Sequence, residues 1–245
     1  MRFVRGCAWT AVLGLALAAV PSASANTVQL KLVDYNDVGI GFNLNGAAKW
    51  APGGGLVFEQ VGGSPVLPSP LYANCIEIFQ DLTPNQIISF DLTDIELAPV
   101  PGQAVPTPIT AGPMGATKAA LLQELYSRTY SDNLSDAERA AFQLAIWEIV
   151  YDGDLNVVAP YGKLYGYSNM YQSQSLTALA QSYLNAVALD DNFMPIDGLT
   201  ALVNDDYQDI AIIVPESLVV PLPGAVWGGL ALLGTLAGIR ARRRA

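Results

Sequence analysis

The sequence contains no histidine, and this absence excludes several kinds of site. Cysteine–histidine and serine–histidine catalysis both need an imidazole to move a proton, and many transition-metal sites use one as a ligand. A reactive group in this chain must therefore find its proton partners among carboxylates, tyrosines and the backbone.

Cysteine is almost as scarce, because the chain has only Cys7 and Cys75. Cys7 lies in an N-terminal segment that we expect to be removed, so the mature protein keeps one thiol. A single cysteine cannot form an intramolecular disulfide. Most free cysteines are small buried hydrophobic residues, but an odd thiol in an exported protein asks for another explanation.

Basic residues are few and unevenly placed. Six of the 12 lysines and arginines lie in the two terminal segments, whereas all 22 acidic residues lie between Asp34 and Glu216. That central part carries an excess of 16 acidic residues, and its field repels phosphate backbones. We therefore expect no nucleic-acid partner.

The first 25 residues predict a secretory signal peptide. Arg2 and Arg5 form a basic start, Ala8 to Val20 is an apolar run, and Ala23-Ser24-Ala25 is a small-residue cleavage site before Asn26. The apolar run has 13 residues, fewer than the ~20 that a membrane-spanning helix needs. Export to the cell envelope follows from this prediction.

The last residues, 220–245, predict a second targeting segment. Pro221-Leu222-Pro223 precedes an apolar run, 224–239, that predicts a membrane helix, and the arginines after it favour a cytoplasmic end. These arginines are Arg240, Arg242, Arg243 and Arg244. The segment resembles the PEP-CTERM sorting tails of Gram-negative bacteria, in a variant with Leu222 in place of glutamate. The resemblance implies an exosortase as partner, transient passage through the inner membrane and delivery to the cell surface; an ordinary C-terminal membrane anchor is the alternative.

The central part, 26–219, predicts an α+β fold. Hydrophobic alternation predicts strands, and a later change to a 3.6-residue period predicts helices. The fold we expect is an antiparallel β-sandwich or barrel lobe, about 26–97 and 207–219, with an inserted three-helix lobe, about 114–190. The expected strands are two within Asn26–Leu44, then Leu56–Glu59, Cys75–Phe79, Ile87–Leu97 and Tyr207–Val214; Val61–Tyr72 is an expected loop, Ala98–Pro113 a proline-rich linker, and the expected helices are Thr117–Tyr130, Ser135–Tyr151 and Ser175–Leu189.

The predicted second helix carries an unusual glutamine. Ser135 and Glu138 have the capping-box spacing that starts a helix. The apolar run that follows, Ala141 to Asp152, contains Gln143, and a buried amide without a partner costs roughly 1–3 kcal/mol. An amide bonded to a loop carbonyl is one explanation for this residue.

Together, Cys75 and Gln143 suggest another explanation. Tyr72-Ala73-Asn74-Cys75-Ile76-Glu77 and Phe142-Gln143-Leu144-Ala145-Ile146-Trp147 resemble the cysteine strand and glutamine helix of the thioester domains of bacterial surface adhesins. Phe142 replaces the family's threonine, and Asn74 and Glu77 replace its usual aromatic and aspartate.

The resemblance implies an internal Cys75–Gln143 thioester within Val28 to Val214. The protein would then be an adhesion protein that forms an isopeptide bond once with a lysine or other amine, without turnover or cofactor. We expect Tyr72, Phe142 and Trp147 to shield the bond from water. Glu77, a tyrosine or the backbone would have to move the proton.

Other functions remain open at this point. A non-covalent structural or glycan-binding surface protein could use the tyrosine-rich loop Tyr161–Tyr171, whereas no pair of carboxylates stands out for a hydrolase. Asp152-Gly153-Asp154 and Asp190-Asp191-Asn192 could contact calcium, but both lack EF-hand spacing and we favour turn chemistry.

Overall fold

The computed structural model describes residues 26–100, 112–160, 162–166, 174–187 and 193–214. The predicted signal peptide and sorting tail, with its membrane helix, lie outside these ranges. Within them, none of the helices has the length and apolar character required to cross a membrane.

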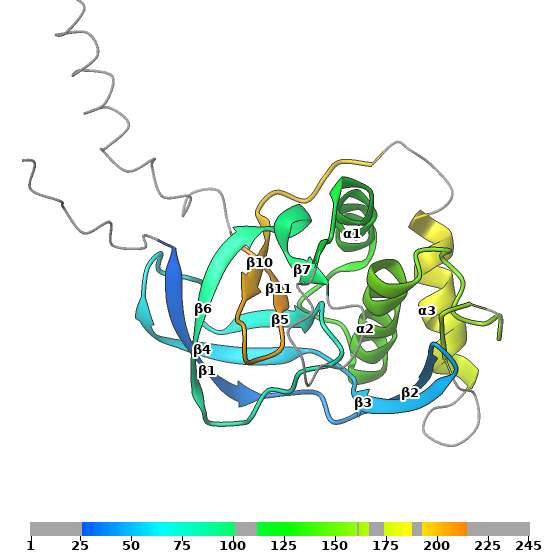
Figure 1. Cartoon of the computed structure of the whole chain (residues 1–245), viewed down its shortest axis with the longest axis horizontal. Coiled ribbons are helices and arrows are strands. Elements are labelled where there is room, and N and C mark those ends of the chain that lie inside the picture. Colours follow the sequence, from blue (N-terminus) through cyan, green and yellow to red (C-terminus); the bar gives the residue numbers. More distant parts are fainter. Residues whose placement is uncertain (1–25, 101–111, 161, 167–173, 188–192, 215–245) are drawn as a thin grey trace, which may run out of the picture.

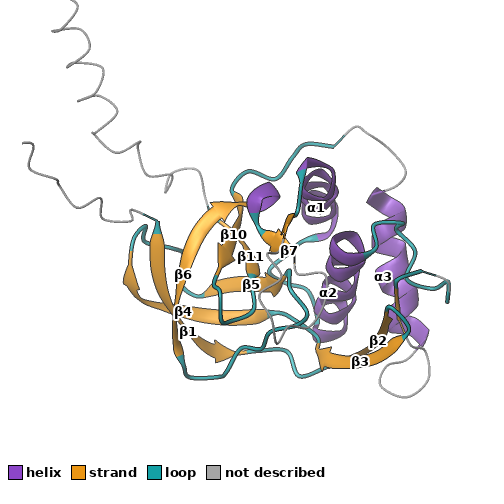
Figure 2. Ribbon diagram, in the orientation of Figure 1, coloured by secondary structure: helices purple, strands orange, loops and turns teal. Residues whose placement is uncertain are grey.

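Six antiparallel strands close into a barrel in the order β1-β4-β5-β11-β10-β6 (Figures 1 and 2). Val28, Leu30 and Leu32 of β1 point inward and alternate with more exposed residues, which is the pattern of a strand with one buried face. Phe58 and Phe90 meet edge to face inside the barrel, with ring centroids 6.3 Å apart. The barrel strands are β1 (Thr27–Asp34), β4 (Leu56–Gly63), β5 (Leu71–Cys75), β6 (Ile87–Asp94), β10 (Leu199–Val203) and β11 (Ile210–Ile213).

Three helices form the other half of the molecule, beside a small separate sheet. The helices are α1 (Ala116–Thr129), α2 (Asp136–Tyr151) and α3 (Gln174–Val187), and the sheet has the order β3-β2-β9, from Ala47–Pro52, Gly39–Leu44 and Leu164–Gly166. Helix α2 contacts α1, α3, β2, β9 and the barrel strand β5. It therefore packs between the barrel and the rest of the helical region (Figure 1).

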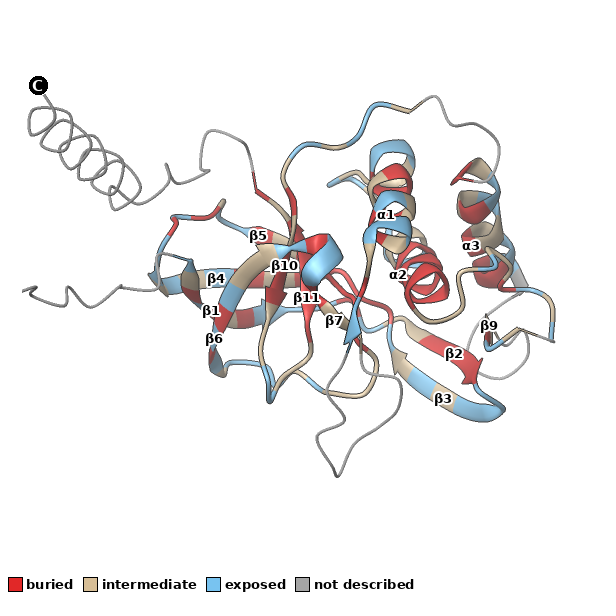
Figure 3. Cartoon of the chain, turned by 45° about the horizontal axis from the view of Figure 1, so that its top comes forward, coloured by how far each residue is buried: buried red, intermediate tan, exposed pale blue. Residues whose placement is uncertain are grey.

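The sequence of α2 explains its start and its burial. The predicted capping box is confirmed, since the Ser135 N–H donates to Glu138 Oε2 at 2.8 Å and the Ser135 hydroxyl accepts from the Glu138 N–H. All residues from Ala140 to Val150 are buried, including Gln143 and Glu148 (Figure 3). A helix that is buried all round belongs to the interior of a fold.

The prediction of a strand from Cys75 to Phe79 is wrong, because β5 ends at Cys75. The Glu77 carboxylate accepts hydrogen bonds from the backbone N–H groups of Phe79 and Gln80, and this local turn competes with strand pairing. The predicted loop Val61–Tyr72 is also too long, since β4 continues to Gly63 and β5 starts at Leu71.

The three helices and the antiparallel lobe are as predicted, and the lobe is a closed barrel. The predicted division of the chain is wrong in two places. Strands β2 and β3 belong to the sheet beside the helices, and the chain returns to the barrel at β10, before the expected residue 207. Around the proline-rich segment, the 3₁₀ helix η1 (Ile95–Leu97) leads to β7 (Pro99–Val100), which pairs with β8 (Gly112–Pro113).

Candidate functional site

Cys75 lies at the end of β5, where the barrel meets α2. It is 5% exposed, and it pairs in register with Ile210 of β11. The next residue, Ile76, donates its N–H to the Asp209 carbonyl at 3.0 Å, on the β11 side. Backbone groups of successive strand residues point to opposite sides, so the N–H and C=O of Cys75 point toward β4.

The amide of Gln143 occupies the position that a β4 residue would take. Gln143 Oε1 accepts from the Cys75 N–H at 2.9 Å, and Gln143 Nε2 donates to the Cys75 carbonyl at 2.7 Å. The structure therefore brings together the two residues that the sequence singled out, 68 positions apart. It also shows how a buried glutamine is satisfied, because both ends of its amide have a partner.

Gly54 makes room for this contact. The β4–β5 register places Leu56 opposite Ala73, so residue 54 would come opposite Cys75 if β4 continued. Instead Gly54 has a φ of +74°, and a Cβ on it would lie 2.5 Å from Gln143 Oε1. A glycine is needed here for both its backbone conformation and its missing side chain.

The thiol of Cys75 contacts a residue that the sequence did not single out. Cys75 Sγ lies 3.1 Å from Gln208 Oε1, and Gln208 Nε2 donates to the Glu77 carbonyl at 2.6 Å. Gln208 thus holds both the thiol and the turn that ends β5. Nothing in the pattern around Gln208 distinguished it from the other polar residues that precede the last strand.

The surroundings of Cys75 favour the protonated thiol. Burial raises the pKa of Cys75, and the nearby Glu77 raises it further, while its backbone hydrogen bond acts in the opposite direction. Burial also raises the pKa of the Glu77 carboxyl. At neutral pH the thiol therefore keeps its proton and can donate it to Gln208 Oε1.

A cavity of about 290 Å³ adjoins Cys75 and Gln208. Its wall includes apolar and aromatic side chains of the barrel, of β2 and β3, and of α2, among them Phe42, Trp50 and Trp147. Trp50 is 54% exposed, so the cavity reaches the protein surface beside β3. A small molecule or a side chain of another protein could approach the sulfur along this path.

The four residues expected to support the site have different positions. Trp147 lines the cavity beside Cys75 and packs on Phe42, with ring centroids 5.2 Å apart. Phe142 packs edge to face on Tyr126 at 4.9 Å and does not line the cavity.

Tyr72 and Glu77 make contacts other than the ones expected from the sequence. The Arg139 guanidinium lies over the Tyr72 ring, with Arg139 Cζ 5.4 Å from the ring centroid. Tyr72 also lines a second cavity. The Glu77 carboxylate is engaged by its own turn. Among the four, only Trp147 lines the cavity that adjoins the thiol.

The comparisons with known proteins add one distant likeness. No family model matches the sequence, and no curated protein matches it. Among solved structures, the fold is similar to the N-terminal thioester domain of a surface protein from Clostridium perfringens, with a TM-score of 0.40 and 11% identity. The match covers 76% of this chain and 98% of that chain. A likeness at this distance does not assign a family.

Proposed function

We propose that the protein is an exported surface or extracellular-matrix protein that stores a Cys75–Gln143 thioester for covalent attachment to amines. One observation carries the proposal: the Gln143 amide is held by two hydrogen bonds against the backbone of the cysteine whose thiol lines a surface-reaching cavity. These hydrogen bonds hold the Gln143 amide against the residue that carries the thiol, and holding two reacting groups close together lowers the barrier of an acyl transfer.

The contacts suit the formation of the bond. Sγ attacks the amide carbon of Gln143, the carbon–nitrogen bond breaks, and the thiol proton leaves with the nitrogen as ammonia. The Cys75 N–H, which donates to Gln143 Oε1, would stabilise the negative charge that develops on this oxygen. Gln208, in contact with Sγ, positions the thiol during the reaction.

The stored bond would react once with an amine. An amine such as a lysine side chain attacks the acyl carbon, a carbon–nitrogen bond forms, and the sulfur takes a proton to become a thiol again. The cavity gives the amine its path, and Trp147 limits the access of water. Because nothing regenerates the thioester, the protein is a single-use reagent and not an enzyme.

Intact mass under denaturing conditions tests the proposal. The protein isolated from its native cell should be lighter than its sequence, after allowance for processed termini, by one ammonia. Methylamine should add to it. Cys75→Ala should abolish both effects.

Gln181 offers a matched control for Gln143. It also lies on a helix, and its amide also bridges backbone groups, accepting from the Val157 N–H and donating to the Leu155 carbonyl, both at 3.0 Å. No cysteine is involved in that contact. Gln143→Ala should remove the mass deficit, whereas Gln181→Ala should keep it; a wild-type mass equal to the unmodified sequence would refute the proposal.

Secretion and sorting complete the proposed function. The predicted signal peptide would direct export, and the tail at Pro221-Leu222-Pro223 would be processed by an exosortase after passage through the inner membrane. Detection of the Cys75 domain at the cell surface, and its retention in the inner membrane when the exosortase is deleted, is the expected result. Surface display that does not depend on the exosortase would support the ordinary anchor.

A non-covalent binding protein is the second candidate, and one observation favours it. The cavity beside Cys75 has an aromatic wall that includes Trp50 and Trp147, and pockets lined by aromatic side chains are typical ligand sites. On this reading Cys75→Ala would keep full function. The tyrosine-rich loop considered for glycan binding lies mostly outside the described residues.

A further inference from the structure

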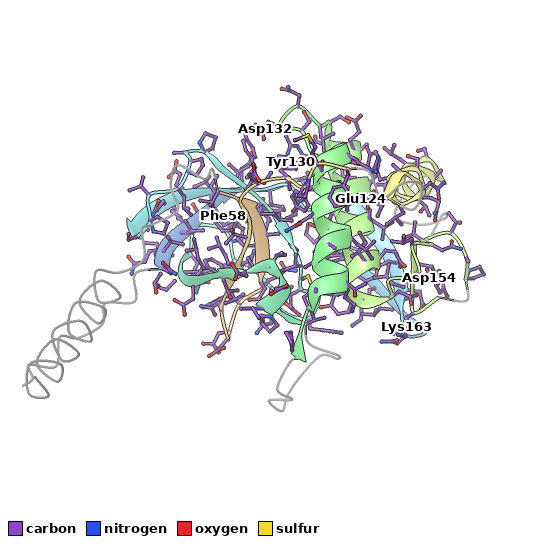
Figure 4. The ribbon with its side chains drawn as sticks, turned by 90° about the horizontal axis from the view of Figure 1, so that it is seen from above. Phe58, Glu124, Tyr130, Asp132, Asp154 and Lys163 are labelled. Atoms are coloured by element: carbon purple, nitrogen blue, oxygen red, sulfur yellow. The ribbon has the colours of Figure 1, made fainter. Side chains whose placement is uncertain are left out.

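Three carboxylates gather at the C-terminal end of α2. Glu148 lies in the last turn of the helix, Asp152 is its C-cap, and Asp154 follows in the next turn. One oxygen from each lies within 4.8 Å of the others. Figure 4 shows Asp154 near Lys163 at the end of the helical region, far from Phe58 in the barrel.

Glu148 is the residue that makes this cluster unusual. It is 0% exposed, and its Oε2 has no hydrogen-bond partner within the part of the chain that the structure describes. Its Oε1 receives only a long hydrogen bond, 3.4 Å, from the Asn156 N–H. An unpartnered oxygen on a buried carboxylate costs about 1–3 kcal/mol or more, so a missing partner is expected here.

Asp152 and Asp154 are held in place by backbone N–H groups. Asp152 Oδ2 accepts from the backbone N–H groups of Lys163 and Leu164, and Asp154 Oδ1 accepts from that of Asn156 at 2.9 Å. These contacts are the turn chemistry expected from the sequence. They fix the two side chains beside Glu148 and leave Asp152 Oδ1 without a hydrogen bond among the described residues.

Two lysines, Lys118 and Lys163, lie near the cluster, but neither forms an ion pair with it within the described residues. Lys118 donates to the Val150 carbonyl. The negative end of the α2 dipole lies here, and the last turn of α2 contains no basic residue.

We propose that Glu148, Asp152 and Asp154 bind a calcium ion. The ligand set is made of oxygens alone, which selects a hard cation over zinc or copper. Two oxygens bound to one calcium ion lie at most about 5.2 Å apart, twice the calcium–oxygen distance, and three oxygens within 4.8 Å of one another satisfy this limit. Water would complete the coordination. The competing partner for Glu148 is a proton shared with Asp154.

Thermal unfolding of the full chain tests this site without reference to the thioester. Calcium at about a hundred times its Kd, compared with chelator, should raise the unfolding midpoint by about 5–10 °C at pH 7. Terbium, which replaces calcium, should show luminescence sensitised by the nearby Trp147 and Tyr151.

Two variants make the result decisive. Glu148→Gln keeps the side-chain volume and removes repulsion, so it should unfold no earlier than wild type in chelator and should lose the calcium response. Glu59→Gln, at an exposed position of β4, is the matched control and should keep it.

The absence of a calcium shift in wild type would overturn the proposal, as would a full shift in Glu148→Gln. A different pair of results would assign the site to a shared proton. The wild-type unfolding midpoint would not change with calcium, and the Glu148→Gln midpoint would exceed that of wild type at pH 8 but not at pH 5.

Discussion

At the scale of single residues, Gly54 determines how closely α2 approaches β5. The space that a side chain would fill at this position is taken by the amide of Gln143. Gly46, in the turn between β2 and β3, has a similar φ of +83°, but nothing lies within 4 Å of a Cβ built on it. The two glycines therefore separate the cost of backbone strain from the cost of a blocked contact.

Gly54→Ala should be more damaging than Gly46→Ala. We expect roughly 1 kcal/mol of destabilisation for the strained backbone alone, and at least about 2 kcal/mol where the Gln143 amide is also displaced. Urea unfolding measures the difference, and intact mass should show that only Gly54→Ala loses the proposed thioester. Equal costs for the two variants would mean that the Gly54–Gln143 contact has no energetic weight.

A second prediction at this scale concerns Asp209 and the pH dependence of the free energy of unfolding. Burial raises the pKa of its carboxyl to about 7, and the nearby Glu77 and Asp205 contribute, while the Asn204 N–H opposes the shift. The unfolded value is about 3.8. Between these two values the folded state binds the proton that the unfolded state has lost, so the free energy of unfolding falls as pH rises.

Asp209→Asn should remove this part of the pH dependence. The Asn side chain keeps an oxygen for the Asn204 N–H, which donates to Asp209 Oδ1 at 2.8 Å. Between pH 4 and 8, in chelator, wild type should lose up to about 4 kcal/mol more than the variant, since one pKa unit corresponds to about 1.4 kcal/mol. Parallel curves from urea unfolding would contradict the assignment.

At the scale of elements, α2 contributes residues to both proposed sites. Its first turn holds the capping box, its middle holds Gln143 and Trp147, and its end holds the acidic cluster. Because α2 is buried from Ala140 to Val150, it cannot lose its first turn without disturbing the contacts with β5. A change that destabilises the first turn of α2 should therefore also weaken the contacts between α2 and β5.

Ser135→Ala should lower the free energy of unfolding by about 1 kcal/mol, since it removes an N-cap hydroxyl. Ser182→Ala is the control, because that hydroxyl lies inside α3 and bonds only to the Leu179 carbonyl at 2.7 Å. It should change stability by less than about 0.5 kcal/mol. Chemical unfolding followed by circular dichroism measures both, and equal losses would show that the cap has no special weight.

At the scale of the whole molecule, the proposed bond would join the two halves of the fold. Cys75 belongs to the barrel and Gln143 to the helical region, so the thioester would close a loop across them. A cross-link over 68 residues restricts the unfolded chain, and the chain-entropy model gives about 4 kcal/mol for a loop of this length.

Methylamine should therefore lower stability as it opens the bond. We expect wild type to lose up to about 4 kcal/mol of unfolding free energy, with the mass of the adduct confirming the reaction. Cys75→Ala, treated in the same way, should not change. If the adduct forms and stability stays constant, the bond does not restrain the unfolded chain.

The sequence indicated the helices better than the strands, for physical reasons. The capping box and the long apolar run defined α2 within a residue. Strand β9 has only three residues, too few for a periodic signal, and the alternation from Cys75 to Phe79 was overridden by the Glu77 turn.

The site was only partly predictable. The pair Cys75 and Gln143 came from a resemblance of short motifs, because no periodicity could place a strand end against a helix 68 residues away. Gln208 and Gly54 have roles that depend on this tertiary contact alone. The helical pattern did not distinguish Glu148 from its neighbours, and its unpaired oxygen is evident only from the structure.

The hydrogen bond from Gln143 Nε2 to the Cys75 carbonyl has a consequence for the products of the proposed reaction. Loss of ammonia would remove this donor and leave the carbonyl unpaired. Capture of a lysine creates a secondary amide, whose N–H can return to the same acceptor. Hydrolysis creates an anionic carboxylate, which faces the carbonyl without a proton to offer. The edge of β5 would thus discriminate between the two fates and favour conjugation over spontaneous decay.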